Sequence, residues 1–208
     1  HLSIRRQRQM CIRDSYMTAG GYIQNYATNP EGPISFERGD VLNAVTLSAV
    51  TWLIFTLFAG WVSDYIGRRR TYLIGFVVQA IGAGILFPLV NSASLGLLYV
   101  ALIFLTVGLG LTYGAQSAMY AELYPASVRA SGVSISYAIG SILGGAFAPM
   151  IAASLVDATG TTVAVTIYLV TASLVGFTAI LLLQERKGIP LSPDFETEQS
   201  KSPFIFGK

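Results

Sequence analysis

Apolar residues gather in five long runs, and short polar segments separate each run from the next. The runs cover residues 41–61, 71–90, 95–121, 128–156 and 163–183. A helix needs about 20 predominantly apolar residues to cross the hydrocarbon core of a bilayer, and each run is long enough. No run alternates apolar and polar residues as the strands of a membrane β-barrel do. The pattern therefore predicts an all-α transmembrane protein, with a bundle of five helices over residues 40–186.

The two ends of the chain are more polar than its middle. Residues 16–28 are too short and too polar to span a bilayer alone, and a strong turn signal, NPEGP at 29–33, follows them. We therefore expect a partial transmembrane helix over residues 15–29, the last part of a sixth helix whose start is missing. Residues 1–14 are basic and without periodicity; we expect a non-native leader, with a basic cytoplasmic loop as the alternative. Residues 187–208 are expected to form a polar cytoplasmic tail that is disordered or lies along the surface.

Composition agrees with a membrane protein and excludes several other classes. Hydrophobic residues make up 53% of the 208-residue chain and charged residues only 12%, whereas an average soluble domain has about 25% charged residues. The formal net charge of +2 is too small to indicate a nucleic-acid partner. The single cysteine, Cys11, and the single histidine, His1, exclude an internal disulfide framework and a metal cluster built from Cys or His. We expect no metal, no cofactor and no nucleic acid.

Basic residues are divided unequally between the two sets of alternate loops. One set holds a single basic residue, Arg38, among several carboxylates. The other set holds six basic residues, which are Arg68, Arg69, Arg70, Arg129, Arg186 and Lys187. Because cytoplasmic loops carry the excess of Lys and Arg, we expect this second set in the cytoplasm. The C-terminus of a multi-pass protein of the cell (inner) membrane would then also be cytoplasmic.

An arginine-rich turn, here called the signature turn, lies between the first and second runs. Glycines let helices or backbone approach closely, and an aspartate at a membrane edge can accept hydrogen bonds from a neighbouring helix N-terminus. Arginines can pair with carboxylates or anionic lipid headgroups. A simpler interpretation is topological, because arginine clusters flank many membrane helices. The turn contains Gly60, Asp64, Gly67, Arg68, Arg69 and Arg70.

The spacing of these residues, G-x3-D-x2-G-R-R-R, resembles the signature of the major facilitator superfamily. In that family the signature occupies the cytoplasmic turn between the second and third helices of each six-helix half. Tyr65 stands where the family usually has a basic residue, a departure that is common in the second half. The resemblance implies the C-terminal six-helix half of a twelve-helix fold, with five complete helices and part of one.

A second motif, YGAQSAMYAELYPASVRASG, covers residues 113–132. Its Y-G-x-Q and E-L-[FY]-P-x-x-V-R-x-[ST]-G patterns resemble the region of the tenth and eleventh helices in the metabolite:proton symporter branch of that superfamily. Residues 140–149, GSILGGAFAP, resemble the same branch. Its members carry shikimate, 2-oxoglutarate, citrate, or proline with glycine betaine. The resemblance implies a secondary active transporter that moves a small organic acid or zwitterionic metabolite with protons by alternating access.

The two motifs are expected to bring charges to one end of the bundle. Glu122 should end one helix there and Arg129 should begin the next, on the same side as Asp64 and the three arginines of the signature turn. An ion-pair network among these side chains would hold a cytoplasmic gate closed in one state and release it in the other. The alternative is that Glu122 and Arg129 are ordinary boundary charges.

Polar residues at helical spacing within the runs are candidates for a substrate cavity, because polar groups that face lipid are costly. The alternative for each of them is a hydrogen bond between neighbouring helices. The candidates are Asn43, Tyr113, Gln116, Tyr120, Ser134, Tyr137 and Ser141, with Gln24 in the partial helix.

Two stretches of the expected bundle, 71–121 and 130–156, contain no Asp, Glu, Lys, Arg or His. A proton-coupled carrier needs a titrating group in or near its pathway. We therefore expect the proton site in a missing N-terminal half, which would be a partner of this chain together with the lipid bilayer, protons and a small-molecule substrate. The alternatives are a truncated fragment that does not transport, and a major facilitator of another branch, such as a sugar or drug carrier. A membrane enzyme is disfavoured, since the bundle has no Cys or His and its carboxylates lie near helix ends or in loops.

Overall fold

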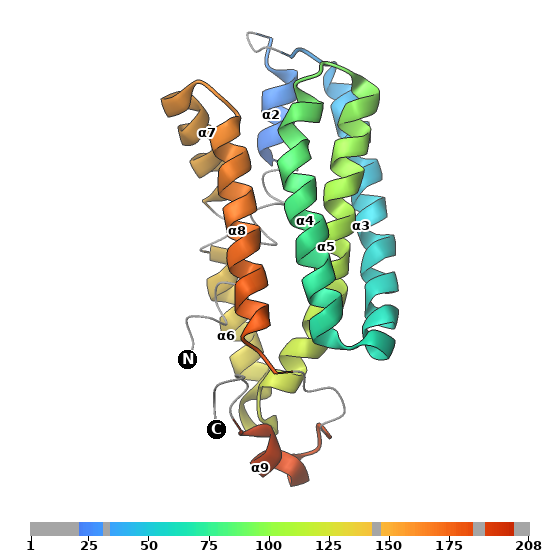
Figure 1. Ribbon diagram of the computed structural model, residues 1–208, viewed down its shortest axis with the longest axis vertical. Coiled ribbons are helices and arrows are strands. Elements are labelled where there is room, and N and C mark those ends of the chain that lie inside the picture. Colours follow the sequence, from blue (N-terminus) through green and yellow to red (C-terminus); the bar gives the residue numbers. More distant parts are fainter. Residues whose placement is uncertain (1–20, 31–33, 143–146, 185–189, 202–208) are drawn as a thin grey trace.

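A computed structural model of the chain describes residues 21–30, 34–142, 147–184 and 190–201. All the elements in these ranges are helices. The long helices run roughly parallel to the longest axis of the molecule (Figure 1). This arrangement confirms the predicted all-α fold. The expected leader, residues 1–14, lies outside the described part of the chain.

Four of the helices in the described ranges are long and apolar enough to cross a membrane. They correspond to the first, second, third and fifth apolar runs. Helices α3 and α5 have 29 residues each, more than the roughly 20 that a bilayer requires. The four helices are α3 (Arg38–Ile66), α4 (Arg68–Val90), α5 (Leu95–Leu123) and α8 (Val163–Leu181).

The fourth apolar run, residues 128–156, differs from the single span that we expected. It contains two described helices, α6 (Arg129–Ser141) and α7 (Ala148–Thr159), and residues 143–146 between them are not described. Pro149 lies in the first turn of α7. Proline lacks the amide that a helix interior needs but that a first turn leaves unpaired, so Pro149 favours a helix start. The structure begins helix α7 here.

Helix α5 packs between α3 and α4, and α8 packs against α4 (Figure 1). Glycines on α5 make these contacts close. A β-carbon built on Gly108 would lie 2.5 Å from the backbone nitrogen of Gln79 in α4, and one on Gly114 would overlap the carbonyl oxygen of Thr56 in α3. Membrane helices commonly pack through small residues, because these allow the two backbones to approach.

At one end of the bundle the chain reverses between α3 and α4 through the single residue Gly67. Its φ of 101° is a conformation that glycine adopts readily and other residues rarely do. The same end carries η2 (Ala126–Val128), which connects α5 to α6. The expected polar tail contributes η4 (Pro193–Phe195) and α9 (Glu196–Gln199), which contacts η2. The tail thus contains helical turns that lie against the bundle end (Figure 1).

Helix α2 (Ile23–Thr28) lies at the opposite end of the bundle. It occupies the last part of the expected partial helix over residues 15–29. The rings of Tyr22 and Tyr26 lie edge-on to Phe87 of α4, with centroids 6.2 and 6.1 Å away. The hydroxyl of Tyr26 donates to Oδ1 of Asn91 at 2.9 Å. These contacts hold α2 against the end of α4.

Candidate functional site

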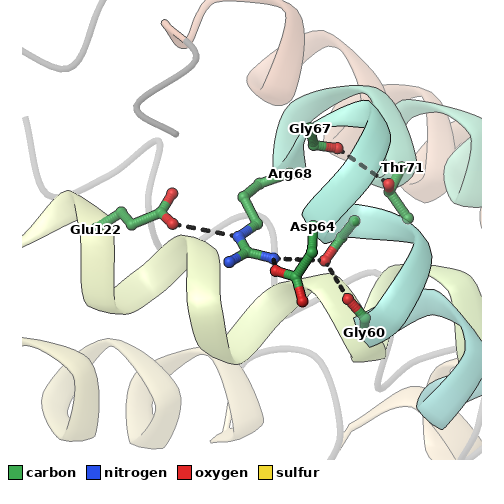
Figure 2. A network of polar contacts seen from close by, with 7 residues as sticks. Gly60, Asp64, Gly67, Arg68, Thr71 and Glu122 are labelled. Atoms are coloured by element: carbon green, nitrogen blue, oxygen red, sulfur yellow. Dashed lines mark hydrogen bonds and ion pairs between the residues drawn. The ribbon is translucent and has the colours of Figure 1, made fainter. Parts of the chain in front are cut away.

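One guanidinium joins three helices at the signature turn (Figure 2). Arg68, the first residue of α4, donates from Nε to Oε1 of Glu122 in α5 at 3.2 Å. Its Nη1 donates to Oγ of Ser63 in α3 at 2.7 Å and forms an ion pair with Oδ1 of Asp64 in the last turn of α3. We call Ser63, Asp64, Arg68 and Glu122 the Arg68 network. It ties α3, α4 and α5 together at one end of the bundle.

The two ion pairs of Arg68 differ in their exposure to solvent. The side chain of Arg68 is 17% exposed and that of Glu122 is 11% exposed, whereas that of Asp64 is 62% exposed. Exposed pairs are screened by water and contribute about 0–1 kcal/mol. The pair between Arg68 and Glu122 is therefore the stronger link of the network, and the pair with Asp64 adds less.

The backbone around the signature turn positions Arg68. The amide of Gly67 donates to the carbonyl of Ser63 at 3.1 Å and closes the last turn of α3. The hydroxyl of Ser63 donates to the carbonyl of Gly60 at 2.7 Å, and that of Thr71 donates to the carbonyl of Gly67 at 3.0 Å (Figure 2). These bonds satisfy carbonyl groups on both sides of the reversal. The start of α4 is thus held where its guanidinium reaches α3 and α5.

The other two arginines of the signature turn lie apart from this network. Arg69 donates to the carbonyls of Ile180 at 3.4 Å and Leu181 at 2.7 Å, so it ties α4 to the C-terminal end of α8. Carbonyls at a helix C-terminus carry the negative end of the helix dipole and attract a cation. Arg70 is exposed. Within the described ranges it has no recorded side-chain hydrogen bond or ion pair.

Arg129 does not join the network in which we expected it. Its Nε donates to the carbonyl of Tyr124 at 3.3 Å, its Nη1 to the carbonyl of Leu191 at 3.0 Å, and its Nη2 to Oε1 of Gln199 at 3.1 Å. Arg129 therefore holds the tail against the α5–α6 connection. The structure brings together Asp64, Arg68 and Glu122, and it places Arg129 with the tail, where Leu191 and Gln199 offer acceptors.

A cavity of about 400 Å³ lies among α3, α5 and α6, and we call it the α3–α5–α6 cavity. Four of the expected cavity residues line it, which are Tyr113, Gln116, Tyr120 and Tyr137. Gly60, which we assigned to the signature turn, also lies in its wall. Sequence reasoning missed the other lining residues, which are Thr56, Leu57, Gly114, Ser117 and Val133.

Helical spacing finds Thr56 and Ser117 among these missed residues. Thr56 lies four residues before Gly60 on α3, and Ser117 lies four residues after Tyr113 on α5, so each shares a helix face with an expected residue. Leu57 and Val133 are apolar, and an apolar residue in a membrane helix gives no signal that distinguishes a cavity from lipid. Their place in the wall follows from packing alone.

The remaining expected cavity residues lie elsewhere. Asn43 is exposed near the start of α3, and Ser134 is exposed on α6. Gln24 lines a separate small pocket of about 50 Å³ with Arg38 near α2. The side chain of Ser141 is outside the described part of the structure. Of the three whose side chains the structure describes, Asn43, Ser134 and Gln24, none lines the α3–α5–α6 cavity.

Three tyrosines, Tyr113, Tyr120 and Tyr137, are among the residues that line the α3–α5–α6 cavity. The hydroxyl oxygens of Tyr113 and Tyr137 lie 3.4 Å apart and share a hydrogen bond between α5 and α6. The ring of Trp52 lies edge-on to that of Tyr113, with centroids 5.3 Å apart. Gln116 is buried, and its Oε1 has no hydrogen-bond partner within the described ranges. The lining residues contain no Asp, Glu, Lys, Arg or His.

A metal centre is not among the features of the described chain. The residues that the structure describes contain no group of three or more His, Cys, Asp or Glu side chains placed to hold a metal ion. The chemistry available at the two sites is therefore ion pairing at the signature turn, and hydrogen bonding and aromatic contact in the cavity.

Comparison with known proteins gives the family. Residues 17–206 match the model of the Major Facilitator Superfamily. A metabolite transport protein of Haemophilus influenzae is 36% identical over 70% of this chain and 33% of its own length. An ectoine/proline transporter of Corynebacterium glutamicum is 28% identical over 86% of the chain and 37% of its own length. A citrate-proton symporter of Klebsiella pneumoniae is 28% identical over 76% of the chain and 36% of its own length.

The matched family and the names of these relatives indicate a transport protein and not an enzyme, as the sequence predicted. The chain spans about a third of the length of these relatives. The resemblance carried by the signature turn and by the second motif is confirmed: this chain is a multi-pass membrane protein that belongs to the Major Facilitator Superfamily.

Proposed function

We propose that the whole protein is a secondary active transporter, which carries a small organic acid or zwitterionic metabolite with protons across the cell inner membrane by alternating access. The names of two relatives, an ectoine/proline transporter and a citrate-proton symporter, support this substrate range and the proton coupling. Carriers of this kind bind substrate near the bilayer midplane, between two sets of helices. In this proposal the present chain supplies one wall of the binding site, and helices outside it supply the other.

The observation that carries the proposal is the α3–α5–α6 cavity. It places the polar groups of Tyr113, Gln116 and Tyr120 inside helices that are otherwise apolar. Polar side chains in a membrane bundle usually face protein or an aqueous cavity. The volume of about 400 Å³ lies in the range of about 300–1,000 Å³ that is typical of small-molecule sites.

The Arg68 network is, in this proposal, part of a gate on the cytoplasmic side. The positive-inside rule supports that orientation for the arginine-rich end, and with it a cytoplasmic C-terminus. The network links α3 and α5, which form two walls of the cavity, to α4. Two conformations of a protein commonly differ in free energy by only a few kcal/mol. A largely buried ion pair such as Arg68–Glu122 therefore contributes to the free-energy difference between the closed and open states of the gate.

The proton site is proposed to lie outside this chain. Helix α4 beyond its initial arginines, and α5 before Glu122, carry no ionisable Asp, Glu, Lys, Arg or His. A proton that crosses the membrane with substrate needs a titrating group along its path. Helices of the whole protein that are absent from this sequence would supply it.

Reconstitution of the full-length protein in proteoliposomes tests the function. Uptake of labelled proline, glycine betaine and citrate is measured with and without an inward proton gradient. We expect the gradient to accelerate uptake of at least one of them and a protonophore to remove the acceleration. Folded protein that takes up none of the three would contradict the proposed transport activity, and uptake indifferent to the gradient would contradict proton coupling.

Glu122→Gln tests the gate in the same assay. We expect uptake to slow about tenfold, equivalent to ~1.4 kcal/mol, because the amide keeps the shape of the carboxylate and loses its charge. Glu37→Gln is the matched control, since Glu37 is exposed at the other end of α3 and its side chain makes no capping hydrogen bond. Equal uptake rates for the two variants would show that Glu122 is not part of the gate.

A further inference from the structure

The α3–α5–α6 cavity is unsuited to a carboxylate. Its described lining has no Arg, Lys or His side chain. A carboxylate that leaves water without a cationic partner loses a large hydration free energy. The acidic end of a substrate would therefore find no compensating charge in this wall.

The same wall offers aromatic surface to a cation. Tyr113 is 37% exposed and Tyr137 is 38% exposed, and their hydroxyl oxygens meet at 3.4 Å. The hydroxyl ends of two rings, one from α5 and one from α6, thus meet in the cavity wall. Trp52 packs edge-on against Tyr113 and supports its ring from α3. An ammonium ion within about 6 Å of a tyrosine ring centroid, over the ring face, is attracted by the ring quadrupole.

Gln116 adds a hydrogen-bond acceptor to this wall. Its side chain is 5% exposed, and its Oε1 has no partner among the described residues. A buried acceptor without a partner is unfavourable. An N–H group of a bound ammonium would satisfy it, whereas a fully methylated nitrogen has no hydrogen to donate.

We propose that the α3–α5–α6 cavity binds the ammonium group of a zwitterionic substrate against the rings of Tyr113 and Tyr137. Gln116 accepts a hydrogen bond from that group where the substrate has an N–H. This inference rests on the proposed transport function and narrows its substrates to zwitterions. The carboxylate of the same substrate is then bound by helices outside this chain.

The test measures equilibrium binding of proline, glycine betaine and citrate to purified full-length protein by calorimetry, with uptake in proteoliposomes in parallel. Tyr137→Leu removes the ring, and Tyr137→Phe keeps it. We expect Tyr137→Leu to raise the Kd for glycine betaine about tenfold, equivalent to ~1.4 kcal/mol, and Tyr137→Phe to change it much less. Tyr99→Leu is the matched control, since Tyr99 lies on α5 outside the cavity lining.

Gln116→Leu gives a second measure that does not depend on Tyr137. It should weaken the binding of proline, whose ammonium carries N–H groups, more than the binding of glycine betaine, whose nitrogen carries none. If Tyr137→Leu fails to fold, this difference between the two ligands tests whether the cavity binds the ammonium group. Equal losses for the two ligands, or equal Kd values for Tyr137→Leu and Tyr137→Phe, overturn the inference.

The two assays separate the inference from the transport function. Ring-dependent binding of zwitterions without any uptake would support the cavity assignment and contradict transport. Uptake and binding of citrate alone would leave transport standing and overturn the cavity assignment. Absence of both binding and uptake in folded protein would overturn both.

Discussion

Arg68 has two carboxylate partners, and the burial of each partner decides how much it contributes. Glu122 is the less exposed of the two and lies in α5, 54 residues away in the chain. Asp64 is mostly exposed and lies at the end of α3, only four residues away in the chain. The bond to Glu122 links helices that are distant in the sequence, whereas the pair with Asp64 spans only the short connection between α3 and α4 and mainly orients the guanidinium.

Glu122→Gln should therefore lower the stability of the protein more than Asp64→Asn. We expect about 1–2 kcal/mol for loss of the charge-assisted bond of Glu122 and about 0.2–1 kcal/mol for loss of the exposed pair of Asp64. Thermal unfolding of the purified full-length protein in detergent measures both. A larger loss of stability for Asp64→Asn would show that solvent exposure does not determine which of the two ion pairs contributes more to stability.

The sequence predicted the partnership of Arg68 and Glu122 only in outline. Charges that flank apolar runs at the same end of a bundle are readily predicted to lie close together. The structure shows ion pairs of Arg68 with Asp64 and Glu122, but Arg129 has other partners. Two of the three acceptors that bind Arg129, the carbonyl of Leu191 and Oε1 of Gln199, lie more than 60 residues later, in a polar tail with no hydrophobic periodicity. Local pattern carries no information about such a contact.

At the scale of elements, the tail and the α5–α6 connection are linked through Gln199. Its side chain is buried, its Oε1 accepts from the amide of Ala126 at 2.9 Å, and its Nε2 donates to the carbonyls of Pro190 and Ser192. Arg129 also donates to the same Oε1. Helix α9 has four residues, too few to be stable alone, so these side-chain bonds hold it in place.

Arg129→Ala should release the tail. Loss of its bonds to Leu191 and Gln199 should make residues 190–201 more accessible, and limited proteolysis of the full-length protein would then cut this segment several-fold faster. Arg70→Ala serves as the control, because Arg70 is exposed and its side chain has no recorded bond in the described chain. Unchanged cleavage of Arg129→Ala would show that the tail is held by other contacts.

The contact between α4 and α5 depends on glycine. Gly108→Ala would place its methyl group 2.5 Å from the backbone nitrogen of Gln79, and backbone gives way less easily than a side chain. We expect a loss of stability of about 1–3 kcal/mol from overpacking, measured as a fall in the thermal midpoint. Gly84→Ala on α4 should have little effect, since a β-carbon there has nothing within 4 Å. Equal midpoints for the two variants would show that α4 and α5 separate easily.

Hydropathy predicted the long helices well but not the start of α7 at Ala148 within the fourth run. Apolar residues are equally compatible with one span or with two shorter helices, so the mean hydropathy over residues 128–156 gave no sign of this helix start. The informative residue is Pro149, which favours a first helical turn. Cavity residues behaved similarly: tyrosines and Gln116 were found by their polarity and spacing, and apolar Leu57 and Val133 were not.

At the scale of the molecule, α3 is the least covered of the long helices. A smaller share of its most apolar window is buried than in α4, α5 or α8. Large apolar side chains along it remain exposed, among them Leu53, Ile54, Leu57, Phe58 and Trp61. In a membrane these face lipid or further helices. The cavity borders the same helix, so its remaining wall is expected from those helices.

The 208-residue chain produced alone should insert into membranes and show no proton-driven uptake. Its uncovered α3 should also promote self-association, which size-exclusion chromatography in mild detergent would detect. The full-length protein is the comparison, with uptake expected under the same gradient. Robust uptake by the isolated chain would mean that the second wall of the cavity is unnecessary.

Gly67 sets a mechanical condition on any such carrier. A single residue joins α3 to α4, and successive Cα atoms are only 3.8 Å apart, so the two helix ends have almost no slack between them. Tilting α3 must carry the first turn of α4 with it, together with Arg68 and Arg69. Since Arg69 holds the end of α8, a displacement at the cavity wall is passed across the bundle to its far side. The ends of α3 and α4 that meet at Gly67 would thus move together.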